Sequence, residues 1–396
     1  MNISLLRFKL IYIILLLLCF VSLNFSYSVK AYSYNQRTII LFNSDIIDSN
    51  YKDYIIKKHN GTKIKEISIL NGVIANFSAK DKKELEVESC IRSVEEDKVV
   101  RAAGRTRQHN TIIQPEQIKP WGITKIKADS LWNISNGNSI KVAILDSGVD
   151  FSHPDLKEMI KGGYNALNSK KIPSDDYGHG THVAGIIAAS NNSIGVVGVS
   201  PNADLYVVKV LDGAGNGYSS DLIEGIGWAI TNKMNIVNMS LEAQPSEALY
   251  NAIKKANESG IVQVSSSGNN PDNPVTYPAA YSEVISVTAI DSNDERAFYA
   301  STGKVDIAAP GVDIYSTYIG SIYSIMSGTS MAAPHVTGVV ALMLSNPLSV
   351  DLNLDGKVTP SEVKQKLEKT AFDLGIPGKD NIYGSGLVNS YAAVTN

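Results

Sequence analysis

Cysteine is nearly absent from this chain of 396 residues, which contains only Cys19 and Cys90. No cysteine follows residue 116, and this excludes a disulfide scaffold and any Cys-ligated zinc, haem or iron–sulfur site in that part. Charged residues are also few, at 19%, whereas 44% of the residues are hydrophobic. This composition excludes a disordered chain and supplies enough apolar surface for a large core.

The chain has no overall excess of basic residues, because its formal net charge is -3. The charges are uneven: residues 1–116 hold 17 Lys and Arg against 12 Asp and Glu, and the remainder holds 19 against 27. An acidic main part argues against DNA or an anionic membrane as its partner. We therefore expect no nucleic-acid partner and no membrane partner after removal of the leader described next. We also expect a monomeric protein.

Only one long hydrophobic run occurs, from Leu10 to Leu23, and two basic residues precede it. The run is shorter than the roughly 20 residues that span a bilayer, which argues against the alternative of a transmembrane anchor. Small residues follow and end in a small-x-small pattern at Ala31. The pattern predicts a secretory signal peptide over residues 1–31 and a secreted, extracellular product.

The remaining chain divides into two parts by its pattern of apolar residues. The first, residues 32–103, is predicted to be a small α+β unit with strands at 37–42, 65–70, 73–77 and 93–99 and a helix at 78–87. A polar stretch at 103–110 indicates an exposed linker, and we expect residues 104–116 to be the segment where the chain is processed.

The part from 117 to 396 predicts an α/β fold. Its strand candidates are 140–145, 205–210, 236–239, 261–264 and 284–287, and its helix candidates are 219–232, 246–258 and 330–344. Strands made almost entirely of apolar residues that alternate with helices indicate a mostly parallel sheet with helices on both faces.

Three motifs in this part carry residues suited to catalysis. Asp146 ends a predicted buried strand, which is where ligands bind in open α/β sheets, although such an Asp is often only a turn former. His179 and His182 lie three apart in Gly-His-Gly-Thr-His and could be metal ligands, or one could be a base; their spacing does not choose. Ser330 precedes a long apolar helix, where a serine is ordinarily an N-cap.

Taken together, the order Asp, His, Ser is one of the known chain orders of the serine-nucleophile triad. The three motifs, with the stretches 191–196 and 235–241, resemble those of the subtilisin-like serine proteases, the subtilases, from about Gln117 to the end. The resemblance implies that Ser330 is the nucleophile, His179 the general base and Asp146 its partner, with His182 structural. It also implies that the amide of Asn269 belongs to the oxyanion hole.

The resemblance extends to substrate binding and to residues 32–103. Ser240, Leu241 and Glu242 resemble the edge strand that pairs with an extended substrate, and Gly268 would line the same cleft. Residues 32–103 resemble the family's prosegment, which implies an intramolecular inhibitor. The family commonly has glycine at Glu242. Together with Asp272, this acid predicts a first pocket that prefers Arg or Lys, unless both acids face solvent.

Two calcium sites are predicted. Residues 351–362 fit D-x-[DN]-x-[DN]-G-x5-E completely, and the alternative is an ordinary polar loop. Its ligand positions are Asp351, Asn353, Asp355, Lys357, Thr359 and Glu362. The resemblance implies a second site, with side chains of Gln117, Asp155 and Asn192 and backbone oxygens of Ser190, Ile194 and Val196.

The sequence thus predicts a secreted, calcium-dependent serine endopeptidase made as a proenzyme. One narrower interpretation is a processing protease similar to lantibiotic leader peptidases, which cut after a basic residue. The alternatives are a broad-specificity nutritional protease and a catalytically silent binding protein. The junction contains Arg101, Arg105 and Arg107, which favour cleavage after Arg, whereas the family resemblance puts the end of the prosegment nearer Ala103.

Overall fold

The computed structural model describes residues 36–43, 48–111 and 114–396, with the backbone alone for 105–111. The predicted signal peptide lies outside the described residues and stays a prediction. Within the described ranges, no helix is long and apolar enough to cross a membrane.

The N-terminal unit is a four-stranded antiparallel sheet with the order β2-β3-β1-β4. Side chains alternate along a strand, so Ile40 and Phe42 of β1 pack on the unit's own helices while Ile39 and Leu41 face the larger domain. The elements are β1 (Gln36–Phe42), α2 (Ser49–Lys58), β2 (Thr62–Ile67), β3 (Gly72–Phe77), α3 (Ala79–Leu85) and β4 (Ile91–Glu96).

The larger domain contains a seven-stranded sheet with the order β15-β14-β13-β11-β7-β9-β8. Every pair of neighbouring strands in this sheet is parallel, as the continuous apolar runs of the strands predict. The strands are β7 (Lys141–Asp146), β8 (Ile160–Asn165), β9 (Asp204–Lys209), β11 (Ile236–Met239), β13 (Val262–Ser266), β14 (Val284–Ile290) and β15 (Ile307–Pro310).

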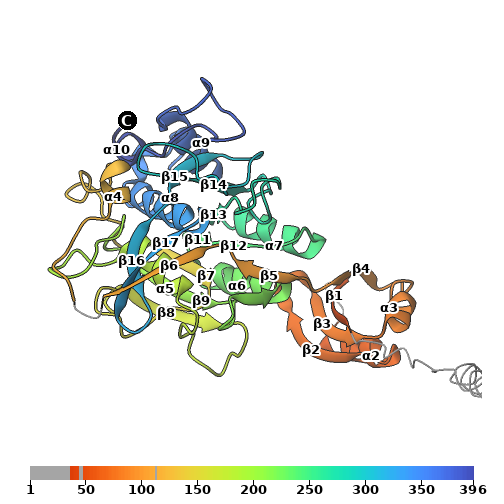
Figure 1. The fold of residues 1–396 in the computed structure, drawn as a ribbon. Helices are drawn as coiled ribbons and strands as arrows, with labels where there is room; N and C mark the ends of the chain where they lie inside the picture. The colour runs from red at the N-terminus through yellow and green to blue at the C-terminus, as the bar shows by residue number, and fades with distance from the viewer. Residues whose placement is uncertain (1–35, 44–47, 112–113) are drawn as a thin grey trace, which may run out of the picture.

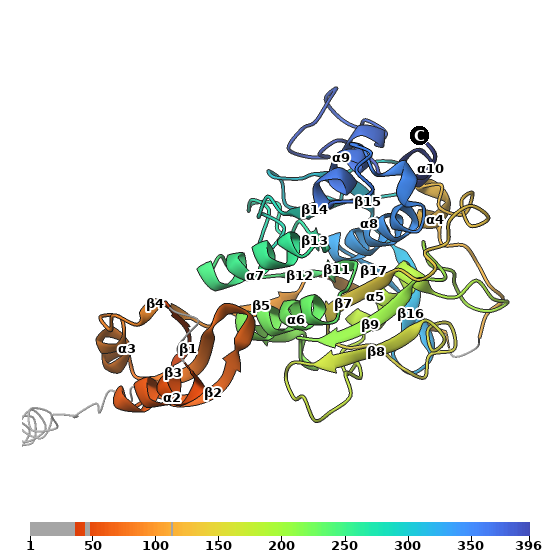
Figure 2. The ribbon, with the colours of Figure 1, turned by 180° about the vertical axis from the view of Figure 1, so that it is seen from behind.

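Helices cover both faces of this sheet, which confirms the predicted α/β class (Figures 1 and 2). Strand β7 shows the two faces: Val142 and Ile144 pack with α5 and α8, whereas Ala143 and Leu145 pack with α6 and α7. The helices of the domain are α4 (Trp121–Lys125), α5 (His179–Ala188), α6 (Ser219–Thr231), α7 (Glu247–Glu258), α8 (Thr329–Leu344), α9 (Pro360–Thr370) and α10 (Ser390–Thr395).

The segment that joins the two units is paired along its length with the larger domain. Strand β5 (Val99–Ala102) lies antiparallel between β10 (Asn216–Tyr218) and β12 (Leu241–Glu242). Strand β6 (Arg105–Thr111) then pairs with β17 (Ile322–Ser327), whose other neighbour is β16 (Ile314–Tyr318). Residues 105–111 of the predicted exposed linker therefore form a strand, which the sequence did not predict.

Candidate active site

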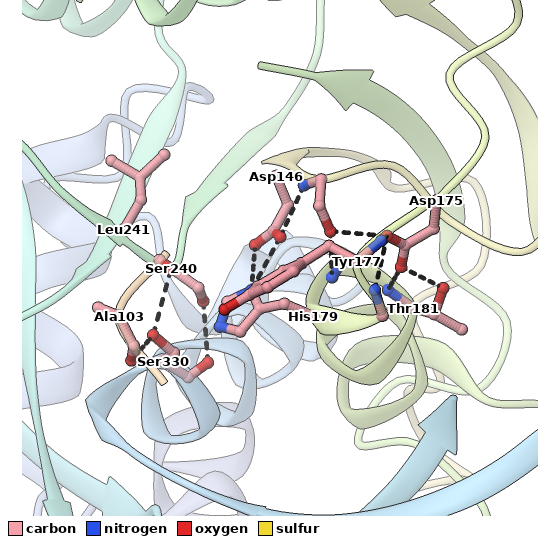
Figure 3. A network of polar contacts seen from close by, with 12 residues as sticks. Ala103, Asp146, Asp175, Tyr177, His179, Thr181, Ser240, Leu241 and Ser330 are labelled. Atoms are coloured by element: carbon pink, nitrogen blue, oxygen red, sulfur yellow. Dashed lines mark hydrogen bonds and ion pairs between the residues drawn. The ribbon is translucent and has the colours of Figure 1, made fainter. Parts of the chain in front are cut away.

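Asp146 and His179 meet where β7 ends and α5 begins (Figure 3). Nδ1 of His179 lies 2.8 and 3.0 Å from the two carboxylate oxygens of Asp146, and both side chains are buried. Gly178 precedes the helix with φ +101°, a conformation that glycine adopts without a steric penalty. This turn aims the first side chain of α5 back toward the end of β7.

The charge of Asp146 determines the protonation of His179. Burial alone would lower the pKa of His179, but the neighbouring carboxylate and its hydrogen bond raise this pKa above the usual imidazole value. Nε2 of His179 is buried and has no hydrogen-bond partner among the described residues. A buried imidazole with one nitrogen held and the other unpaired is suited to accept a proton.

His182 has a different environment from that of His179. Its Nε2 lies 3.1 Å from the backbone oxygens of both Ile314 and Ser324. Burial lowers the pKa of His182 to about 3, so its imidazole is neutral. The structure therefore ties β16 and β17 to α5 through His182 and brings only His179 to the carboxylate of Asp146.

Ser330 is the second residue of α8 and is buried. Its Oγ donates to the backbone oxygen of Ala103 and lies 3.2 Å from the backbone oxygen of Ser240. The next residue, Gly104, lies against His179: a Cβ added to Gly104 would come within 3.1 Å of the histidine Nε2. The peptide bond between Ala103 and Gly104 therefore lies between the serine hydroxyl and the imidazole.

Asn269 completes this arrangement. Its Nδ2 donates to the oxygen of Ala103 at 2.6 Å, while its Oδ1 accepts from the backbone N–H of Thr329 at 3.0 Å. Neighbouring Gly268, at φ +112°, donates its N–H to Thr329 Oγ1. The side-chain amide of Asn269 is thus held through its oxygen, and its N–H group points to a carbonyl oxygen, as a donor of an oxyanion hole does.

The backbone before Ala103 binds as an added strand. Ala103 donates its N–H to the oxygen of Ser240 at 3.4 Å, and Ala102 pairs with Leu241. Main-chain pairing of this kind is the way an extended peptide adds to a sheet edge.

A family model described as the subtilase family matches residues 137–386, more than half of the chain. This chain belongs to the subtilase family. It is similar to subtilisin E of Bacillus subtilis, with 41% identity over 355 residues that cover 88% of this chain and 87% of the relative. A thermostable alkaline protease of Halalkalibacterium halodurans is 41% identical over 330 residues, covering 83% of this chain and 84% of the relative.

The subtilase is therefore a subtilisin-like serine endopeptidase, as the order of its motifs predicts. Sequence reasoning missed Asp175, which supports the site. Its carboxylate accepts from Ser147 Oγ at 2.8 Å, from the N–H of Gly178 at 2.9 Å, and from both the N–H and the hydroxyl of Thr181. In the sequence, an Asp three residues before a glycine suggests only a turn. The number of groups that hydrogen-bond to Asp175 becomes visible only in the fold.

The two acids predicted for the first pocket of the subtilase lie in different environments. Asp272 is exposed. Glu242 is partly buried in β12, and its Oε1 accepts from the backbone N–H of Asn269 at 3.0 Å. Burial raises the pKa of Glu242, while that N–H and the charge of Arg101 act in the opposite direction. Glu242 therefore contacts Asn269, whereas the Asp272 side chain is exposed.

The residues of the calcium site that the family resemblance implies, around Gln117, Asp155 and Asn192, lie together in the subtilase. The Nε2 of Gln117 is 2.8 Å from the oxygen of Ser190 and 3.3 Å from both Asn192 Oδ1 and the oxygen of Val196. Buried Asp155 accepts from Asn192 Nδ2 and from the N–H of Val196, each at 2.9 Å. The N–H of Ile194 donates to Asn192 Oδ1 at 2.8 Å, which places the sixth residue in the same loop.

The loop 351–362 is turned as its motif predicts, with Gly356 at φ +81°. Asp351 accepts from the N–H groups of Asp355 and Gly356, and Asn353 Oδ1 and Asp355 Oδ1 each accept from the backbone two residues on. Glu362, however, caps α9 together with Thr359. No group of three or more His, Cys, Asp or Glu side chains gathers as a metal site in the described part of the chain.

Proposed function

We propose that this endopeptidase is made as a secreted proenzyme and cleaves its own chain between Ala103 and Gly104. The observation that carries the proposal is the position of the Ala103 carbonyl, whose oxygen accepts from both Asn269 Nδ2 and Ser330 Oγ. The same position supports a prosegment of 32–103 and disfavours cleavage after Arg105 or Arg107, because residues 105–111 pair with β17 beyond the site.

The proposed reaction uses the triad in its ordinary roles. Ser330 Oγ attacks the carbonyl carbon of Ala103 and gives its proton to His179 Nε2, while Asp146 stabilises the imidazolium. The oxyanion that forms takes a stronger hydrogen bond from Asn269 Nδ2 than the carbonyl does. His179 then returns the proton to the nitrogen of Gly104, the C–N bond breaks, and water hydrolyses the acyl group on Ser330.

Residues 36–103 would act as the inhibitor of the enzyme that they help to form. Before cleavage, β5 occupies the substrate edge of β12, and the unit's apolar face packs against α6 and α7. A second strand cannot pair with β12 while β5 is there. After cleavage, the unit must dissociate before peptides or proteins can bind as substrates.

We further propose that the enzyme binds calcium at Gln117, Asp155, Ser190, Asn192, Ile194 and Val196. The oxygens of Ser190, Asn192 and Val196 converge on one point, now next to the Gln117 amide. Rotation of that amide by a half-turn would present its Oε1, and oxygen is the ligand that calcium prefers. Bound calcium would stabilise the folded state without a part in the chemistry. The loop 351–362 is proposed as a second site, although there Glu362 would have to release its cap.

Expression of the Ser330→Ala proenzyme in a host that lacks other subtilases tests the proposed function. We expect intact proenzyme from the variant, and from the unaltered chain a mature product that begins at Gly104, as N-terminal sequencing would show. The loss of hydrolysis should be about 10^4-fold or more. Normal processing of the variant would contradict the role of Ser330, and a mature start at Thr106 or Gln108 would contradict the cleavage site.

A further inference from the structure

Glu242 and Arg101 are opposite each other in the strand pair that holds the proposed cleavage segment. Strand β12 pairs with β5 in antiparallel register, Leu241 with Ala102 and Glu242 with Arg101. Directly opposed residues of an antiparallel pair project their side chains to the same face, about 4.5–5.5 Å apart at Cβ. Arg101 is the third residue before the bond between Ala103 and Gly104, so a substrate's third residue would face this carboxylate.

Glu242 is held in a fixed position where it can act on a neighbouring charge. Its Oε1 is fixed by the backbone N–H of Asn269, and Oε2 has no hydrogen-bond partner among the described residues. Glu242 is partly buried, and the lower dielectric of such a site strengthens the attraction between its carboxylate and a nearby positive charge. The same burial raises the pKa of Glu242. Arg101 is exposed, so its side chain can turn toward the carboxylate without a large desolvation penalty for the guanidinium.

The position of the proposed cleaved bond separates this site from the first pocket. Ala103, the residue before that bond, is buried and small, and it offers no charge for an acid to recognise. We infer that Glu242 selects substrates with Arg or Lys as the third residue before the cleaved bond and a small residue directly before it. This inference rests on the proposed function, because it uses the assignment of Ala103–Gly104 as the cleaved bond.

A peptide that spans residues 98–107, Lys-Val-Val-Arg-Ala-Ala-Gly-Arg-Thr-Arg, allows a direct test with the processed enzyme. Its Arg101 is compared with citrulline, which has the same shape without the charge, and a third peptide carries Arg at position 103 and citrulline at 101. We expect kcat/KM to be about 3- to 10-fold higher with Arg at position 101 than with citrulline, and the ratio to fall as salt is raised.

The variant Glu242→Gln removes the charge and keeps an oxygen to accept from Asn269, so the wall of the cleft should stay in place. We expect the ratio of kcat/KM between the Arg101 and citrulline peptides to fall to near 1 in this variant. The ratio should be unchanged in Asp272→Asn, in which an exposed acid is neutralised. An unchanged ratio in Glu242→Gln, or a ratio near 1 in the unaltered enzyme, overturns the inference. The inference is also overturned if the enzyme prefers the peptide with Arg at position 103 and Glu242→Gln abolishes that preference. Failure of all three peptides to be cut between positions 103 and 104 would instead contradict the proposed function.

Discussion

Gly104 has little space beyond its two hydrogens where it passes His179. An added Cβ would lie 3.0 Å from Cδ2 and 3.1 Å from Nε2 of the imidazole, closer than ordinary van der Waals contact. The substitution Gly104→Ala should therefore displace either the imidazole or the bond to be cut. Because misplacement of reacting groups is costly, we expect self-processing to slow by roughly 3- to 10-fold.

The rate of prosegment release, followed by gel electrophoresis or mass spectrometry, measures this effect. Gly162→Ala is a matched control, because a Cβ added there would meet only the Tyr206 ring at 3.7 Å. Equal processing rates for the two variants would show that Gly104 is not confined by the imidazole.

The protonation of His179 gives a prediction for the pH dependence of self-processing. Burial lowers its pKa, but the charge and hydrogen bond of Asp146 outweigh burial and leave the pKa above the usual imidazole value of about 6.5. A general base must be unprotonated, so the processing rate should rise with pH through a midpoint above that value. Fixed-time assays of proenzyme processing across a range of pH would measure the midpoint, and a midpoint below about 6.5 would contradict the assignment.

At the scale of elements, the sequence predicts those strands and helices whose own residues show an apolar run or a helical spacing of apolar residues. Strand β7 and helix α8 are recognisable as an apolar run and a long apolar helix next to a motif. Strand β6 was not predicted because Arg-Thr-Arg-Gln-His-Asn has no apolar alternation, and its partner β17 lies more than 200 residues further along the chain. Pairing that depends on so distant a partner leaves no local signal.

The same limit applies to the candidate site. Motif order indicated Asp146, Ser330 and one of two histidines, and the family resemblance chose His179. The structure brings Asp146 to His179, and Ser330 to the bond beside His179. Which residue of the junction lies at Ser330 depends on the register of β5 against β12, and no property of a single residue encodes that register. The roles of these residues stay predictions until variants are measured.

The calcium loop gives a prediction at the scale of an element. Asp351→Ala with Asp355→Ala removes two carboxylates from the loop 351–362 but leaves the cap of α9, which Thr359 and Glu362 form. If the loop binds calcium, native mass spectrometry should show one fewer ion per molecule, with little change in the rate of peptide hydrolysis. The exposed Asp272→Ala serves as the control. An unchanged calcium content in the double variant would leave the loop as a polar turn before α9.

At the scale of the whole molecule, the N-terminal unit contributes polar contacts as well as apolar ones to the larger domain. Glu95 accepts from the N–H groups of Glu247 and Ala248 at the start of α7, at 2.9 and 2.8 Å. Asp97 accepts from the N–H of Ser220 at the start of α6. Both carboxylates therefore satisfy N–H groups that a helix leaves free at its N-terminus, where negative charge is favourable.

Lys65 crosses the same interface and gives a prediction for inhibition by the prosegment. Its Nζ lies 2.6 Å from Asp221 Oδ1 and 2.5 Å from Glu224 Oε2, and the Asp221 side chain is only 4% exposed. Lys65→Gln would leave a nearly buried carboxylate with a weaker partner. Arg37 lies 3.5 Å from the same Asp221 oxygen and retains part of the attraction. We expect the loss to be about 1–2 kcal/mol, below the range for a fully buried pair.

Such a loss corresponds to an inhibition constant raised about 5- to 30-fold when residues 32–103 are added as a separate chain to the processed enzyme. Lys80→Gln is the matched control, because Lys80 is 85% exposed and its ion pair, with Glu84, is within α3. Raising the salt concentration should narrow the difference between the two prosegments, since Lys65 is itself partly exposed. Equal inhibition constants at low salt would mean that the apolar face against α6 and α7, rather than this ion pair, determines how tightly the unit is held.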